Sequence, residues 1–232
     1  AIISGAAEKE RAEMAMASLD KELVLNEEKI LLLLRPPFNN SKNDPGYIMA
    51  YPPGIRENGG QYTHGVLWAL WALAKIGKGD RAFELFNMIN PINHARQKAD
   101  AKLYRVEPYV LSADVYGAHP HLGRGGWTWY TGSAAWMYQI GIEQLLGIQR
   151  ERDELIIEPS IPRHWPGFEI KYRFGKSLYK IEVVQKSNTG KTVKEEERSL
   201  SLDGKELEGN SVALVDDKKE HRIKLIIKTV DR

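Results

Sequence analysis

The stretch Thr63–Gly77, "THGVLWALWALAKIG", has the strongest pattern in the chain and decides the fold class of its first part. Thr63 is a candidate N-cap and Gly77 a candidate stop. Apolar residues recur at steps of three and four, the spacing of one helical face, at Val66, Leu67, Leu70, Trp71 and Ala74. The pattern predicts a buried α-helix.

Three neighbouring segments share this helical spacing. Gly5–Leu23 consists of good helix formers, and "RAFELFNMI" follows Asp80, a candidate cap. Ser133–Gly147, "SAAWMYQIGIEQLLG", places Trp136 and Ile140 on one face and is expected to end at its glycine. The first part of the chain is therefore predicted to be helical.

After about residue 150 the period changes to that of strands. The short alternating or β-branched runs are "ELIIEP", "FEIKYRF", "SLYKIEVVQ", "SVALV" and "RIKLIIKTV". Turn residues separate them, among them the "DG" pair at Asp203. The prediction is an α part over residues 1–150, followed by an antiparallel β domain over residues 151–232.

Composition excludes several classes of protein. Of 232 residues 42% are hydrophobic, enough for one large domain or two small ones. The 33 basic and 31 acidic residues leave a formal charge of +2 and are scattered, so nothing indicates nucleic acid as a partner. No apolar run approaches the roughly 20 residues that span a bilayer, and there is no cysteine for thiolate chemistry. We expect a cytoplasmic protein.

Two long loops lie between the expected helices, Arg35–His64 and Tyr104–Gly132. Loops longer than about 12–15 residues are usually functional or disordered, and these are too aromatic for disorder. Helices that carry such loops, followed by a β-sandwich, indicate an α-helical toroid with its active site at one rim.

Three chemistries compete for these loops. His119 and His121, joined by Asp114 or Glu107, could hold a metal, but no third ligand has a diagnostic spacing. The run "GRGG" could bind a nucleotide, but it follows no predicted strand and no lysine completes it. Tryptophan and tyrosine beside polar residues and glycines favour the third, a carbohydrate site, and neither a metal nor a cofactor is expected.

Two expected helix starts favour anion binding as well. His64 opens one apolar helix, and Thr131 stands at the start of another. The free N–H groups and the positive dipole at a helix N-terminus attract anions. The pair indicates a phosphate pocket. Trp127 and Trp129 would line one cleft wall if their segment is extended.

Four stretches resemble one known family. They are "YPPGIRENGGQYTH", "RVEPYVLSADVY", "GRGGWTWYTGSAAWMY" and "IEPSIPRHWPGFEI". They resemble glycoside hydrolase family ninety-four, the cellobiose and chitobiose phosphorylase family. The similarity runs nearly unbroken from about Ile2 to about Phe174. It is greatest to the phosphorylase-like C-terminal domain of cyclic β-1,2-glucan synthases and to the 1,2-β-oligoglucan phosphorylases.

The resemblance implies a fold and an activity. The fold is the C-terminal part of an (α/α)6 barrel over residues 1–150, followed by a small jelly-roll-like antiparallel β-sandwich. The activity is inverting phosphorolysis of β-glucans, for which this branch implies a β-1,2 linkage, with inorganic phosphate as co-substrate and α-glucose 1-phosphate as product. By motif position, the phosphate ligands are His64, Thr131 and Gly132. The sugar ligands are Arg56, Glu57, Trp129 and Tyr130.

The chain departs from the family pattern at two points. The family's general acid is an aspartate in a loop expected upstream of this chain, so no catalytic acid is assigned here. Ser112 and Ala113 stand where the disaccharide phosphorylases have a glutamine, which favours the β-1,2-glucan branch.

The expected partners are a β-glucan oligosaccharide, phosphate and the remaining N-terminal part of the enzyme, with a homo-oligomer left open. Membership of a glucan synthase would place the chain at the cytoplasmic face of a membrane. A non-catalytic carbohydrate-binding or structural fragment, and an (α/α)6 glycoside hydrolase, remain as alternatives.

Overall fold

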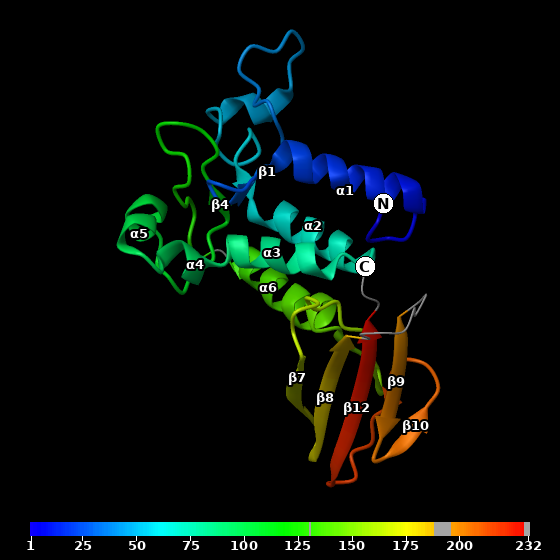
Figure 1. Cartoon of the computed structure of the whole chain (residues 1–232). Coiled ribbons are helices and arrows are strands. Elements are labelled where there is room, and N and C mark those ends of the chain that lie inside the picture. Colours follow the sequence, from blue (N-terminus) through cyan, green and yellow to red (C-terminus); the bar gives the residue numbers. More distant parts are fainter. Residues whose placement is uncertain (130, 188–195, 230–232) are drawn as a thin grey trace. The chain divides into compact units, whose positions relative to one another are not determined.

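A computed structural model describes residues 1–129, 131–187 and 196–229 of the chain (Figure 1). It divides into two compact units, Ala1–Gly141 and Ile142–Arg232. Helices dominate the first unit and strands the second, in the order that the sequence predicts. The expected boundary at residue 150 falls inside a strand of the second unit.

The first unit combines helices with short two-residue strands. Its elements are α1 (Lys9–Leu23), β1 (Val24–Leu25), β2 (Ile30–Leu31), η1 (Gly46–Ala50), β3 (Gln61–Tyr62), α2 (Thr63–Lys75), α3 (Gly79–Ile89), α4 (Pro91–Ala95), α5 (Lys98–Tyr104), β4 (Asp114–Val115) and α6 (Thr131–Gln139). Helix α2 packs against α3 and α6, and β1 pairs with β2 in a short hairpin.

Helix α2 is the buried helix that the sequence predicts. Val66, Leu67 and Leu70 are almost completely buried, because apolar residues cover most of the helix surface. Gly77, at φ +75°, follows the last turn as expected. The predicted cap at Thr63 is wrong: Tyr62 is the N-cap, and the Thr63 hydroxyl instead donates to the Ser112 carbonyl at 2.8 Å.

Three other helix boundaries differ from the prediction. Helix α1 begins at Lys9, four residues after the predicted start at Gly5. Helix α3 begins one residue before Asp80, with Lys78 as N-cap, so the aspartate lies in the first turn, where its charge favours the helix dipole. Helix α6 begins at Thr131, earlier than expected, and continues as a π-helix, η2 (Ile140–Leu145). Gly147, at φ +67°, follows it.

The second unit is built from a five-stranded and a three-stranded sheet (Figure 1). The strand order is β10-β9-β12-β8-β7 in one sheet and β11-β6-β5 in the other. The strands are β5 (Ile148–Glu151), β6 (Glu154–Ile157), β7 (Gly167–Phe174), β8 (Ser177–Ser187), β9 (Glu197–Leu202), β10 (Lys205–Leu207), β11 (Ser211–Ala213) and β12 (Glu220–Thr229). Every run predicted as a strand is confirmed, while β5, β9 and β10 were not predicted.

One strand pair corrects the prediction that the second part is wholly antiparallel. Strand β12 runs parallel to β8, from Glu220 opposite Leu178 to Thr229 opposite Ser187, and antiparallel to β9. A parallel pair needs a long connection between its strands, and here β9, β10 and β11 supply it. Alternation within a strand does not encode the direction of its partner.

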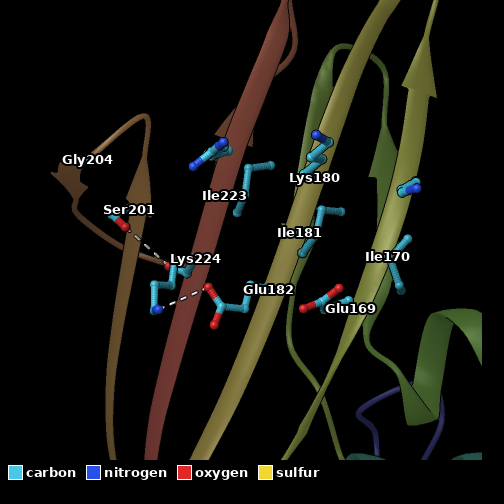
Figure 2. Close-up of a pocket in the computed structure, with 11 residues that line it drawn as sticks. Glu169, Ile170, Lys180, Ile181, Glu182, Ser201, Gly204, Ile223 and Lys224 are labelled. Carbon is cyan, nitrogen blue, oxygen red and sulfur yellow. Dashed lines mark hydrogen bonds and ion pairs between the residues drawn. The ribbon is translucent and has the colours of Figure 1, made fainter.

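One face of the five-stranded sheet carries a hollow of about 770 Å³ (Figure 2). Its charges are largely compensated across the strands: Lys224 pairs with Glu182 at 2.9 Å and Lys180 with Glu220 at 2.6 Å. The residues that line it include no aromatic ring. Because sugars need flat apolar surface as well as polar groups, we interpret this hollow as a solvated sheet face.

Candidate functional site

A short strand pair joins the two long loops of the first unit. Strand β3 pairs antiparallel with β4, Gln61 opposite Val115 and Tyr62 opposite Asp114. Val115 also forms a bridge with Gly125. The pairing therefore collects segments from the loops Arg35–His64 and Tyr104–Gly132 around one strand.

Ala113, directly before β4, connects two segments that lead into helices. Its carbonyl accepts the Thr63 N–H at 2.9 Å, where α2 begins. Its own N–H donates to the Trp127 carbonyl at 2.7 Å, four residues before α6 begins at Thr131. Ala113 is thus hydrogen-bonded directly to the first residue of α2 and, through Trp127, to the segment that leads into α6.

Buried polar side chains fix the first loop. Asn58 is fully buried; its side chain accepts the Phe38 N–H at 2.7 Å and donates to the Phe38 and Tyr51 carbonyls. Gln61 accepts the Leu31 N–H at 3.1 Å. A buried polar group without a partner is costly, so these bonds hold the loop in one conformation.

Arg56 and Trp127 bring a charge and an aromatic face together. The guanidinium carbon of Arg56 lies 3.3 Å from the centroid of the Trp127 ring and 5.6 Å from that of Tyr51. Arg56 has φ +48°, uncommon for a residue other than glycine, while 57% of Trp127 is exposed. The stack leaves the Trp127 ring accessible to a ligand, while Arg56 is half-buried.

Asp114 is the buried carboxylate of the site. Only 2% of it is exposed, and its Oδ1 accepts the Trp127 N–H at 2.9 Å. Burial raises the pKa of Asp114. The hydrogen bond from the Trp127 N–H and the positive charge of Arg56 lower this pKa in part, and the negative charge of Glu57 raises it further. The second oxygen of Glu57, Oε2, is also buried and has no hydrogen-bond partner among the described residues. Glu57 therefore keeps an unused hydrogen-bond acceptor in the interior of the site.

Gly126 allows the backbone to pass close to this carboxylate. A Cβ atom built on Gly126 would overlap the Asp114 carboxyl group. The Gly126 N–H also donates to the Asp114 carbonyl at 2.8 Å. The glycine is needed for a close approach between two loops.

The expected phosphate ligands lie at the two helix starts. His64 is the second residue of α2 and stacks on Tyr62, with ring centroids 5.4 Å apart. Burial lowers its pKa, so the imidazole is neutral at neutral pH before any anion binds. Thr131 is exposed as the first residue of α6, and Gly132 is half-buried behind it.

Of the remaining expected sugar ligands, Trp129 is 67% exposed, and its Nε1–H donates to Glu107 Oε1 at 3.1 Å. Tyr130 lies outside the described residues. Over residues 1–129, 131–187 and 196–229, no three His, Asp or Glu side chains gather closely enough to hold a metal ion.

The structural roles of Asn58 and Asp114 do not follow from the sequence patterns. Asn58 follows Glu57 directly in "ENGG", yet the two residues that its side chain bonds, Tyr51 and Phe38, lie 7 and 20 residues away. From its sequence Asp114 is a candidate metal ligand or a substitute for the missing acid, although its position in a run of apolar residues is a signal of burial. The partners of both residues depend on loop packing.

Exposed aromatic rings, carboxylates and helix N-termini occur together in these loops, a combination typical of sites that bind sugars and anions. The chain belongs to the glycosyl hydrolase 94 superfamily, since residues 1–147 match the model of its catalytic domain. No helix among the described residues is long and apolar enough to cross a membrane.

Curated relatives extend this similarity. The chain is 46% identical to the cyclic β-(1,2)-glucan synthase NdvB of Rhizobium meliloti, over 82% of this chain and 7% of that protein. It is 32% identical to an N,N'-diacetylchitobiose phosphorylase of Vibrio proteolyticus (90% and 25%) and 29% identical to a solabiose phosphorylase of Paenibacillus borealis (97% and 28%). The chain thus spans little more than a quarter of these relatives at most.

Among solved structures, a family GH92 α-mannosidase from Bacteroides thetaiotaomicron matches with a TM-score of 0.28 and 11% identity, over 82% of this chain and 20% of that chain. A similarity of this size does not define a shared fold.

Proposed function

We propose that the chain is the C-terminal part of an inverting glycoside phosphorylase that acts on β-glucans. The observation that carries the proposal is the double link through Ala113, which ties the start of α2, with His64, to the segment that leads to Thr131. Phosphorolysis requires an anion beside the bound sugar. Arg56 and Glu57 stand on the loop that enters β3 and α2 and would bind that sugar.

In the proposed reaction, phosphate oxygen forms a bond to the anomeric carbon while the glycosidic bond to the leaving oxygen breaks on the opposite face. The leaving oxygen takes its proton from a carboxylic acid, which the resemblance places upstream of this chain. An inverting hydrolase would need a second carboxylate to activate water. Phosphate is already anionic, so the Thr131 hydroxyl, the His64 imidazole and helix N–H groups suffice to bind and orient it.

The proposed substrate is a β-1,2-linked glucan. The 46% identity to a cyclic β-(1,2)-glucan synthase supports this linkage over those of the disaccharide phosphorylases. We also propose that the first unit is part of an (α/α)6 barrel and the second a β-sandwich. The remaining N-terminal part of the enzyme would complete the barrel and supply the acid.

Product analysis of the full-length protein tests the proposal. Incubation with β-1,2-glucan and phosphate should release α-glucose 1-phosphate, identified by phosphorus NMR, and omission of phosphate should stop cleavage. A hydrolase would release glucose with or without phosphate. A carbohydrate-binding fragment would bind the glucan and release neither product, and either result would overturn the proposal.

A further inference from the structure

A tight turn presents an aromatic ring beside the site. The Val110 N–H donates to the Glu107 carbonyl at 3.1 Å, which closes a turn with Pro108 at its second position. Proline favours that position because its ring fixes φ near the value the turn requires. Tyr109 stands at the third position and is 73% exposed.

The same turn holds a second ring in place. The indole N–H of Trp129 donates to Glu107 Oε1 at 3.1 Å. Trp129 has φ +59°, an outlier for so bulky a residue, and such a conformation persists only where surrounding contacts impose it. The ring nevertheless remains 67% exposed. Its position is fixed at a cost in backbone strain, although it is not buried in a core.

The two rings meet as the walls of an open corner. The centroids of Tyr109 and Trp129 are 6.2 Å apart, and the ring planes make an angle of 67°. One edge of this corner is formed by the Glu107 carboxylate, which has a second oxygen free of any described hydrogen bond. An aromatic face beside a carboxylate suits a pyranose ring, which offers C–H groups on its face and hydroxyls on its edge.

The corner adjoins the sugar ligands of the proposed function. Trp129 follows Trp127 by two residues, so their Cα atoms are separated by at most about 7 Å. Trp127 carries the Arg56 guanidinium on its face. A sugar chain bound at that stack would therefore pass the corner with one of its next units.

We propose that Tyr109 and Trp129 form a separate subsite for a further unit of an oligosaccharide chain. This assigns Trp129, a sugar ligand by resemblance, to that further unit rather than to the sugar bound at the Arg56–Trp127 stack. The inference rests on the proposed function and extends it to the class of substrate. The site would select oligosaccharides over disaccharides, because only a longer chain reaches both the Arg56–Trp127 stack and the corner.

Binding measured as a function of chain length tests the subsite. The full-length protein is titrated calorimetrically with β-1,2-linked glucose oligosaccharides, from the disaccharide to the pentasaccharide. The wild type should bind the pentasaccharide more tightly than the disaccharide. Tyr109→Ala and Trp129→Ala should each reduce that ratio of affinities by about three- to tenfold, the size expected for one aromatic contact.

Two further variants separate the subsite from a general effect of exposed rings. Tyr138→Ala removes a ring from α6 that is 74% exposed and should leave the affinity ratio at the wild-type value. Trp129→Phe keeps a flat ring but loses the N–H that donates to Glu107, so the ratio should fall less than with alanine. Circular dichroism and unfolding curves verify that each variant folds.

The possible outcomes distinguish the subsite from the proposed function. If Tyr109→Ala and Trp129→Ala keep the wild-type affinity ratio, the subsite is overturned while the proposed function stands. If they weaken all lengths by one factor, the rings belong to the primary sugar site and the separate subsite is again overturned. If the wild type binds no oligosaccharide of any length, the proposed function itself fails.

Discussion

The guanidinium carbon of Arg56 lies 3.3 Å from the centroid of the Trp127 ring. The two residues come from different loops, which the pairing of β3 with β4 brings together. Interactions between a guanidinium and a ring face are worth about 0.5–2 kcal/mol, more where water is excluded. The stack is therefore both a link between loops and an accessible surface.

A double-mutant cycle should detect this link. Arg56→Ala and Trp127→Ala together should destabilise the protein less than the sum of the single changes, by a coupling free energy of about 0.5–2 kcal/mol. Urea unfolding provides the free energies. A control cycle of Arg124→Ala with Trp127→Ala should be additive, because the cation–π contact described for the Trp127 ring is made by Arg56. Additivity in both cycles would contradict the link.

Asp114 should tolerate asparagine much better than alanine. Asparagine keeps the oxygen that accepts the Trp127 N–H, whereas alanine leaves that N–H without its partner, a loss of about 1–3 kcal/mol. Urea unfolding at neutral pH compares the two variants. Equal destabilisation by asparagine and alanine would show that the charge, rather than the acceptor oxygen, is essential.

The same variant has a defined pH dependence. Burial raises the pKa of Asp114 above its unfolded value of about 3.9, so its ionisation disfavours the folded state. Stability from this group is present at low pH and is lost as pH rises through the raised pKa. Asp114→Asn removes that loss. The unfolding free energy of the variant minus that of the wild type should therefore increase as pH rises from about 4 to 7.

Gly126 should not accept a side chain. A Cβ atom there would overlap the Asp114 carboxyl group, so Gly126→Ala should cost about 1–3 kcal/mol through forced loop displacement. Gly141→Ala is the matched control, because its Cβ would meet Phe86 at 3.6 Å, an ordinary contact. Thermal unfolding measures both variants. Equal stability of the two would mean that the loops separate at little cost.

Sequence patterns predicted the elements that depend on local spacing. Helix α2 follows from its repeat of three and four residues, and the "DG" turn follows from two residues that tolerate positive φ. Asp203 and Gly204, at φ +50° and +83°, indeed connect β9 to β10. These features depend on contacts within a few positions.

Features that depend on distant partners could not be predicted in this way. The Thr63 hydroxyl is bonded to a carbonyl 49 residues away, so its capping preference was outweighed by tertiary structure. The position of the Asp114 carboxylate depends on the Trp127 N–H and on the close approach of Gly126, and both reach it only when the loops pack. The parallel pairing of β12 with β8 likewise follows from strand order, which alternation leaves open.

The second unit should lose stability as pH rises above neutrality, through His221. Its ring is hydrogen-bonded to Asp203 at 2.8 Å and to Asp217 at 3.1 Å, and it stacks on Tyr179. These carboxylates raise its pKa, Asp203 most strongly. Stability from the charged ring is complete below the unfolded pKa of about 6.5 and is lost as pH rises through the folded value.

His221→Gln should abolish that loss. Hydrogen exchange of β12 amides, followed from about pH 6 to pH 9 and corrected for intrinsic exchange rates, reports the stability of this unit. His119→Gln, in an exposed loop of the first unit, should behave as the wild type. An unchanged pH dependence in His221→Gln would assign it to other groups.

Thr131→Val tests the phosphate pocket in the full-length enzyme. Valine keeps the shape and removes the hydroxyl, and a hydrogen bond to a charged group is worth about 1.5–3 kcal/mol, so the Michaelis constant for phosphate should rise by roughly tenfold or more. The constant for glucan should change little. Thr128→Val, the same substitution in the preceding loop, should leave the phosphate constant near the wild-type value, because that residue does not begin a helix. If Thr131→Val instead weakened glucan binding and left phosphate kinetics unchanged, the hydroxyl would belong to the sugar site, and the start of α6 would have no role in holding the anion.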